Sequence, residues 1–325
     1  MATFLRYVGK AWSFALRSLK GEHFIIHDCQ SVPKLLFDFS QQLKGLGSLT
    51  HRVVDIEGMY PAMAKPIIRV AMREVLHIIR GTLPPGSGED PRINVPKKGK
   101  KPCEWSSQSG DMWGYAQIRF STMLETLDVV LENTYLRMRD GRMLKQSQGT
   151  PMGDSLSPAI AIGTTAWMEI EWMQTLETDT KKRFRAGRFM DDILLTVSKS
   201  PTWDSDAFIR DFESSTCYMP PLKLEPADAG RFLETRFALL PDGTSRHRLK
   251  NLNEERESNP TTWRYHRFDS FCSDTLKDGV LTGCLRKIAL QASNECNFRF
   301  SLECKLKEFR ALRYPESWLG RAVTG

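Results

Sequence analysis

The chain contains no apolar run that approaches the roughly 20 residues of a bilayer span, so the sequence predicts no membrane-spanning helix. It has no Cys-x-x-Cys pair, and its six histidines do not complete a zinc-binding spacing. The seven cysteines are odd in number, which favours reduced thiols packed in the interior over a disulfide framework. We therefore expect an intracellular protein, and the sequence leaves nucleus and mitochondrion both open.

The composition is that of an ordinary globular protein, with 41% hydrophobic and 26% charged residues among 325. This length predicts one large domain or two to three subdomains. The net charge of +7 favours a polyanionic partner. Residues 246–325 hold 15 Lys+Arg against 10 Asp+Glu, so +5 of the +7 lies in the last quarter of the chain.

The N-terminal segment "MATFLRYVGKAWSFALRSLK" carries four basic residues and no acidic one. Its apolar residues fall on one face of a helix: Phe4, Leu5, Val8, Trp12, Ala15, Leu16 and Leu19. This pattern fits an organelle transit peptide, and it fits a basic amphipathic helix packed on the domain. We favour the packed helix.

The remaining patterns predict an α+β fold, a small antiparallel sheet backed by helices. Helices are expected at 65–80, 116–138 and 157–176, and strands at 51–56, 188–198 and 231–240. Residues 81–112, rich in Gly, Pro, Ser and Lys, are expected to form a mobile insertion. Its Lys97–Lys101 cluster could contact phosphates, and a merely solvated cluster is the alternative. The predicted domains are a basic helical segment (1–50), a central domain (51–245) and a basic helical region (246–325).

Two adjacent carboxylates interrupt an apolar run in "RFMDDILL", residues 188–195. Burying a charge costs several kcal/mol unless it is paired or holds a metal. A turn at Asp191 and Asp192 would make the run a hairpin with both carboxylates at its tip, and an ordinary surface turn is the simpler alternative. A further aspartate, Asp55, ends the β-branched run of "HRVVDIEGMYP", and "QSQGTPMGDSLSPAIA" (146–161) is a Gly- and Pro-rich turn that leads into a helix.

One chemistry explains these three segments together. Two metal ions about 3.5–4 Å apart drive in-line phosphoryl transfer when carboxylates from separate strands bridge them. Asp55 and Asp191 are the expected bridging pair. Mg²⁺ takes hard oxygen ligands and keeps several waters, so few protein carboxylates suffice. Glycines in the 146–161 turn would let a nucleotide or template base approach the backbone closely.

The sequence resembles the reverse transcriptases. "FMDD" is similar to their aromatic-x-Asp-Asp motif, "QGTPMGDSLSP" to their Gln-Gly-x-Pro-x-Gly segment, and "VVDIEGMY" to their first catalytic motif, in the same order. "GRFLETRFALLPDG" resembles their primer-gripping segment. "DIEGMY" and "GRMLKQSQGTPMG" are most similar to Penelope-like retroelements, relatives of telomerase. The resemblance spans roughly residues 50–245.

The resemblance implies an RNA-directed DNA polymerase with a right-hand palm, reduced fingers and a C-terminal thumb. It assigns metal binding to Asp55, Asp191, Asp192 and the backbone carbonyl of Ile56, with two Mg²⁺ ions (Mn²⁺ is an alternative). Tyr60 would exclude a ribose 2′-hydroxyl, with an ordinary core tyrosine as the alternative. Lys223 would protonate the leaving pyrophosphate, with an ordinary surface lysine as the alternative. The remaining residues that it implies are a nucleotide and template pocket at Gln148, Gly149, Pro151 and Gly153, and a primer grip at Phe232, Leu233 and Glu234.

The implied partners are an RNA template, a DNA primer and deoxynucleoside triphosphates. An RNA-templated RNA polymerase is the nearest competitor, but these enzymes usually carry a second aspartate where this chain has Met59 and Tyr60. The 54 residues before Asp55 are too few for full fingers, so we expect a trimmed enzyme or a protein or RNA partner that supplies them. The alternative function is a non-catalytic scaffold that binds RNA or a ribonucleoprotein, and a weaker one is an assembly subunit whose palm docks a protein.

Overall fold

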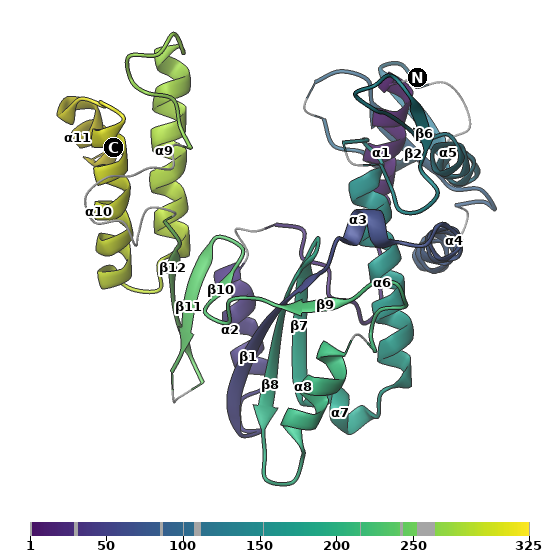
Figure 1. Cartoon of the computed structure of the whole chain (residues 1–325), viewed down its shortest axis with the longest axis horizontal. Helices are drawn as coiled ribbons and strands as arrows, with labels where there is room; N and C mark the ends of the chain where they lie inside the picture. Colours follow the sequence, from purple (N-terminus) through teal and green to yellow (C-terminus); the bar gives the residue numbers. More distant parts are fainter. Residues whose placement is uncertain are drawn as a thin grey trace.

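A four-stranded antiparallel sheet with strand order β7-β8-β1-β9 forms the centre of the molecule (Figure 1). Its strands are β1 (Ser48–Ile56), β7 (Phe184–Phe189), β8 (Asp192–Lys199) and β9 (Leu224–Pro226). This computed structural model describes residues 2–28, 32–84, 87–99, 101–106, 112–151, 153–214, 216–240, 243–251 and 264–324. Because β7 pairs with β8, residues 188–198 form a hairpin whose turn lies next to the aspartates, as one interpretation of the sequence predicted.

A hydrophobic core covers each face of the sheet. Successive residues of the two central strands point to opposite sides, so each strand contributes side chains to both cores. Val54, Ile193 and Leu195 belong to the main core, which also contains α6 (Ser157–Thr175) and α8 (Ser205–Glu213). Val53 and Leu194 belong to a second core with α2 (Val32–Gln42). The short helix α7 (Thr178–Lys182) follows α6 and leads into β7.

A second group of elements lies on the right of Figure 1 and shares the main core. It contains α1 (Ala2–Leu16), α3 (Met59–Ala62), α4 (Lys65–Thr82) and α5 (Phe120–Glu132). The N-terminal segment is thus a packed helix, with Val8, Ala11 and Trp12 fully buried. Helices α4 and α6 begin as expected, each with a proline in its first turn.

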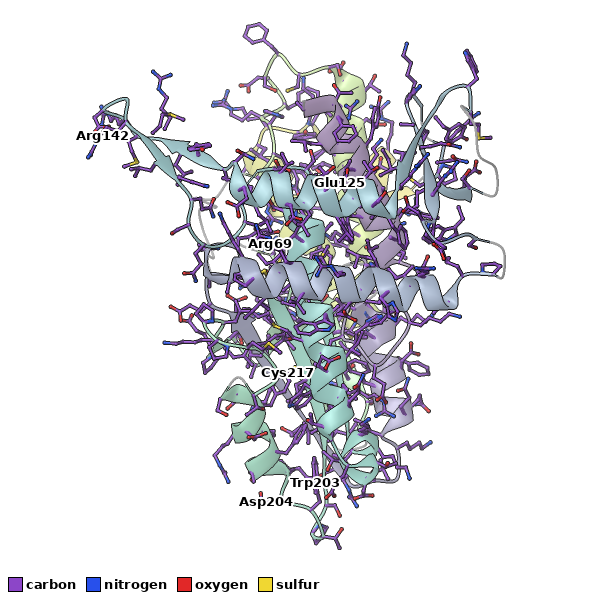
Figure 2. All side chains as sticks on the ribbon, turned by 90° about the vertical axis from the view of Figure 1, so that its right-hand side faces the viewer. Arg69, Glu125, Arg142, Trp203, Asp204 and Cys217 are labelled. Carbon is purple, nitrogen blue, oxygen red and sulfur yellow. The ribbon has the colours of Figure 1, made fainter. Side chains whose placement is uncertain are left out.

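Two sequence-based expectations were wrong in this group. Residues 116–138 do not form one helix: β4 (Tyr115–Arg119) precedes α5 and β5 (Tyr135–Arg137) follows it. The supposed insertion 81–112 contains β2 (Arg92–Pro96) and β3 (Glu104–Ser106), which build a three-stranded sheet β3-β2-β4. Pairing between distant segments decided both cases. Strand β5 pairs with β6 (Met143–Lys145) in a hairpin that projects from the molecule, with Arg142 near its tip (Figure 2).

The C-terminal elements stand on the left of Figure 1. The predicted strand 231–240 is divided into β10 (Arg231–Phe232) and β11 (Thr235–Leu239), which form a sheet with β12 (Ser245–Leu249). Helices α9 (Asp274–Gln291), α10 (Glu295–Ala311) and α11 (Glu316–Thr324) enclose a separate core around Leu281, Phe309 and Tyr314. No helix within the described ranges is long and apolar enough to cross a membrane.

Candidate active site

The Asp191–Asp192 pair lies at the turn that joins β7 to β8. Met190 has a positive φ of 59°, a backbone conformation that is rare for a residue with a side chain and costs of order 1–3 kcal/mol. Positive φ is what tight two-residue hairpin turns require. The Asp191 carbonyl accepts a hydrogen bond from the Ile56 N–H at 3.1 Å, so the turn is tied to the neighbouring strand β1.

Asp55 and Asp192 occupy directly opposed positions on β1 and β8. Opposed residues of antiparallel strands point to the same face, and like charges there repel each other. Burial, followed by the charges of Asp191 and Asp192, raises the pKa of Asp55 to about 6. Burial and Asp191 also raise the pKa of Asp192, against the lowering effect of Arg231. The fold therefore concentrates negative charge at this end of the sheet.

This arrangement fits divalent cations as partners of the carboxylates. A cation would relieve the repulsion that raises the pKa of Asp55 and Asp192. Within the described residues, no group of three or more His, Cys, Asp or Glu side chains is arranged so that it could hold a metal ion. Mg²⁺ does not require three protein ligands, because it is usually bound by one or two carboxylates together with waters and substrate phosphates.

Tyr60 lies on α3, shortly after Ile56 ends β1. Gly58, with φ 53° and ψ 37°, makes the left-handed turn that starts this helix. The Tyr60 side chain is half-buried, and burial followed by the charge of Asp191 raises the pKa of its phenol. Tyr60 is thus within electrostatic range of the candidate site.

The Gln148–Thr150 loop docks on the same short helix. The Gly149 N–H donates to the Met63 carbonyl at 2.8 Å, and the Thr150 N–H donates to the Tyr60 carbonyl at 2.8 Å. Gly149 has φ +76°, and a Cβ on it would lie only 2.4 Å from the Tyr60 carbonyl oxygen. Glycine is therefore required here by both conformation and space, and the loop is held against the helix that follows the first aspartate.

The neighbouring Gln148 donates through its side-chain Nε2 to the Ala62 carbonyl at 2.7 Å. The Pro151 carbonyl accepts a hydrogen bond from the Ser157 hydroxyl at the start of α6. Gly153 has φ +90° and is exposed. The structure thus docks Gln148 and Gly149 on α3 and ties Pro151 to α6, while the roles of these residues toward a nucleotide or template stay predictions.

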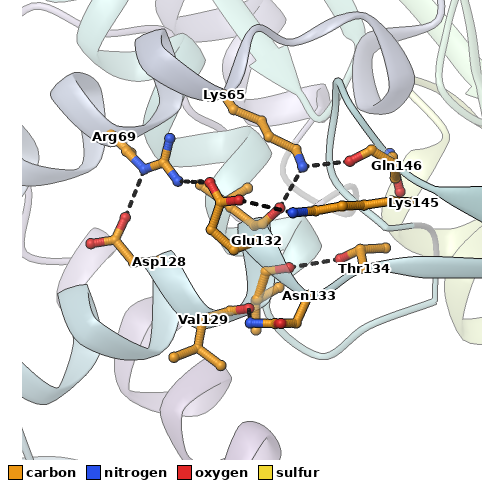
Figure 3. Close-up of polar contacts among 11 residues, drawn as sticks. Lys65, Arg69, Asp128, Val129, Glu132, Asn133, Thr134, Lys145 and Gln146 are labelled. Carbon is orange, nitrogen blue, oxygen red and sulfur yellow. Dashed lines mark hydrogen bonds and ion pairs between the residues drawn. The ribbon is translucent and has the colours of Figure 1, made fainter.

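A buried lysine fixes the approach to this loop (Figure 3). The Lys65 ammonium donates to the Leu131 carbonyl at the end of α5 and to the Gln146 carbonyl at 2.5 Å. On the exposed surface beside Lys65, Glu132 at the end of α5 pairs with Arg69 of α4 at 2.5 Å and with Lys145 of β6 at 3.2 Å. The loop entry is therefore clamped between α4 and α5.

Lys223 lies at the same end of the sheet, one residue before β9. Its carbonyl accepts a hydrogen bond from the Glu57 N–H at 2.9 Å, and its side chain is exposed. Glu225 on β9 opposes Asp55 on β1 and adds to the raised pKa of that carboxyl. Sequence reasoning did not find Glu225 because its position beside Asp55 depends on strand pairing.

The predicted primer-grip residues lie in the bend between β10 and β11. Phe232 is fully buried in the second core. Leu233 has φ 53°, and its carbonyl accepts from the Arg231 Nε at 3.1 Å. Glu234 forms ion pairs with Arg264, at 2.9 Å, and with Lys287 on α9. This segment joins the central sheet to the C-terminal helices, and its role toward a primer stays a prediction.

Sequence reasoning missed a buried ionic network behind the Asp191–Asp192 turn. The Arg188 and Glu169 side chains are 0% exposed and form an ion pair. Glu169 also accepts hydrogen bonds from the Tyr218 hydroxyl at 2.9 Å and from the Phe24 N–H at 2.9 Å. Arg188 donates to the Met190 carbonyl at 2.8 Å, so the network holds the strained residue of the turn. An acidic residue inside the largely apolar helix 157–176 was the available signal.

No family model and no curated protein matches the chain. Solved structures of telomerase are similar to it. The telomerase of Candida albicans in complex with a fragment of telomeric RNA aligns with a TM-score of 0.57 and 14% identity over 95% of this chain and 48% of that one. The chain shares the fold of this telomerase structure.

The telomerase of Candida tropicalis has the same fold in two states. Its apo form aligns with a TM-score of 0.54 and 13% identity over 98% of this chain and 50% of that one. Its complex with a fragment of telomeric RNA also gives 0.54 and 13%, over 94% and 46%. This chain thus spans about half the length of these telomerases. The coarser part of the expectation, a mixed helix-and-sheet fold like that of polymerases, is confirmed, while the palm, fingers and thumb assignments and the Penelope-like affiliation stay predictions.

Proposed function

We propose that this protein is an RNA-directed DNA polymerase whose active site is formed by Asp55, Asp191 and Asp192. The observation that carries the proposal is the opposed pair Asp55–Asp192 beside the Asp191 turn, with the pKa of Asp55 raised to about 6. Clustering of like charges at one sheet end is destabilising unless cations and phosphates use it. The likeness of the fold to telomerase structures supports the same interpretation.

In this proposal the central sheet is the palm, the elements around α4 and α5 are reduced fingers, and α9 to α11 are the thumb. Asp55 and Asp191 would hold two Mg²⁺ ions, with the Ile56 carbonyl and Asp192 beside them. When bound, such ions stabilise the attacking and leaving oxygens of an in-line displacement. Mn²⁺ could replace Mg²⁺ because it accepts the same oxygen ligands.

The reaction joins the 3′-hydroxyl oxygen of the primer to the α-phosphorus of a deoxynucleoside triphosphate. The bond from that phosphorus to its bridging oxygen breaks, and pyrophosphate leaves. Lys223 is the proposed donor of a proton to the leaving pyrophosphate, and the proton of the 3′-hydroxyl passes to water. Tyr60 selects the deoxyribose, and the Gln148–Gly153 loop supports the nucleotide and the template base.

Primer extension on an RNA template with deoxynucleotides tests the proposal. We expect incorporation by the full chain with Mg²⁺ or Mn²⁺ and its loss in Asp191→Asn. Asp206→Asn is the matched control, because Asp206 is an exposed aspartate on α8 at the opposite end of the sheet. Equal activity of both variants would show that the incorporation does not arise at this site.

The same assay decides between the proposal and its rivals. Incorporation of ribonucleotides in preference to deoxynucleotides would identify an RNA-templated RNA polymerase. Retention of RNA binding without incorporation, under either metal and with RNA or DNA templates, would favour the non-catalytic scaffold.

A further inference from the structure

Helix α1 contacts the segment that follows the predicted template loop. A Cβ at Gly9 would lie 2.4 Å from the Ser155 carbonyl oxygen, so the helix and this segment touch backbone to backbone. On the buried side of α1, Trp12 and Leu16 pack in the main core. The helix is therefore held rigidly beside residues 153–157.

The exposed side of α1 presents a row of cations. Arg6, Lys10 and Ser13 are separated by four and three positions, which places them on one helical face, and Arg17 continues the row in the turn directly after α1; all four are exposed. They line an open cavity of about 480 Å³ whose opposite wall contains Cys103 and Ser155. The row thus faces the segment that leads away from the template loop.

No acidic side chain in the described part of the chain neutralises this row. Within the ranges that the structure describes, Arg6, Lys10 and Arg17 form no ion pair, and no acidic residue lines the cavity. Burial raises the pKa of the Cys103 thiol, and the positive charges of Lys10 and Arg17 oppose that rise. The cavity therefore has a positive potential that its own residues do not cancel.

The cations of the C-terminal helices are arranged differently, although the sequence places most of the net charge there. Many cations of this region already pair with carboxylates on the C-terminal helices or on the segments beside them: Arg267 and Arg313 with Asp269, Arg299 with Glu295, Lys307 with Glu303, and Arg310 with Glu316. A paired cation has less attraction for an external anion, so the N-terminal row is the stronger candidate for a phosphate site.

A second basic segment extends the row. The Tyr7 hydroxyl donates to the Lys97 carbonyl at 3.5 Å, which brings Lys97 and Lys98 next to the first turns of α1. The side chains of Lys97, Lys98 and Lys101 are exposed. The lysine cluster, for which the sequence suggested contacts with phosphates, therefore lies next to the basic face of α1.

We propose that the basic face of α1 binds the phosphate backbone of a single-stranded polynucleotide beside the template loop. This inference rests on the proposed polymerase function, in which the strand is the template. Arg17 follows Arg6 by 11 positions, a distance of about 16 Å along the helix axis. A single triphosphate is shorter than this row, whereas successive phosphates of one strand match it. A membrane surface would require exposed apolar side chains among the cations, whereas Phe14 in the cavity lining is half-buried and the exposed residue between Lys10 and Arg17 is Ser13.

The test measures binding of a fluorescent single-stranded RNA by the full chain across a range of salt concentrations, without nucleotides. The triple variant Arg6→Gln, Lys10→Gln, Arg17→Gln should bind at least about tenfold more weakly at low salt. The slope of log affinity against log salt should fall by about two, because each lost single-strand phosphate contact contributes about 0.7.

Two control proteins make the result specific. Lys181→Gln, Lys182→Gln, Lys199→Gln removes the same charge from α7 and the far end of β8, away from α1 in Figure 1, and should leave the slope unchanged. The charge-preserving triple Arg6→Lys, Lys10→Arg, Arg17→Lys should keep the slope of the wild type. Equal slopes for the two glutamine triples overturn the proposal.

Further outcomes separate this proposal from its rivals. Loss of binding to a fluorescent deoxynucleotide, with RNA binding intact, would assign the row to the nucleotide and overturn the strand proposal. Because the assay requires no catalysis, weakened RNA binding in a protein that never extends a primer would support the inference while refuting the polymerase function.

Discussion

The buried pair of Arg188 and Glu169 offers a test of the structure that does not depend on any activity. Both side chains are 0% exposed. Burial by itself would lower the pKa of Arg188, and the adjacent charge of Glu169 raises it above its ordinary value. Removing one partner of such a pair leaves an uncompensated charge in the interior, at a cost of about 3–5 kcal/mol. A domain's total stability is about 5–15 kcal/mol, so this loss is large.

We expect Arg188→Met and Glu169→Gln each to lower the free energy of unfolding by about 3–5 kcal/mol. The double variant should lose markedly less than the sum, because it leaves no unpaired charge in the interior. The amide introduced by Glu169→Gln would still accept the Phe24 N–H, but the Met190 carbonyl would lose its guanidinium donor, at about 1–3 kcal/mol. The double variant should therefore remain less stable than the wild type.

The assay is urea unfolding of the full chain without metal, followed by tryptophan fluorescence, since Trp12 and Trp172 lie in the main core. Arg52→Met is the matched control. Its partner Glu213 is 3.8 Å away, and the two side chains are 39% and 30% exposed. Such a surface pair contributes at most about 1 kcal/mol. A cost below about 1 kcal/mol for Arg188→Met, or simple additivity in the double variant, would refute the reasoning.

Three further predictions concern the candidate site. Because the folded pKa of Asp55 is raised to about 6 from an ordinary value of 3.8, the folded state binds the extra proton between these values and loses stability as pH rises through them. Asp55→Asn should therefore raise Tm at about pH 7.5 in a chelator, with the gain vanishing near pH 4; a lower Tm at the higher pH would contradict this. Tyr60→Ala should admit ribonucleotides, since burying an unpaired hydroxyl against the ring costs about 1–3 kcal/mol, or about ten- to a hundredfold in incorporation ratio. An unchanged ratio would make Tyr60 an ordinary core residue. Gly149→Ala should lower Tm and RNA-templated incorporation well beyond Gly141→Ala, which shares a positive φ but has open space around it; equal effects would show that the contact with α3 is unimportant.

Local chemistry in the sequence was enough to locate the candidate carboxylates. Asp55 and Asp191 stand in apolar, strand-forming runs where a charge is costly, and this conflict marks them without any knowledge of the fold. Helices α4 and α6 were equally readable, since each repeats apolar residues over many turns and has a proline in its first turn. These features depend on neighbours within a few positions, which a sequence displays directly.

Contacts between distant segments were decided only by the tertiary structure. Residues 116–119 read as the start of a helix, but pairing with β2 makes them a strand, because a short apolar run satisfies either pattern until a partner is present. Glu225 reaches Asp55 through strand pairing, and Arg188 reaches Glu169 through packing of β7 on α6. Each of these residues alone looks like a solvated charge. Whether each of these side chains is buried and which partner it meets depend on how distant segments pack together, and this packing is a property of the assembled core.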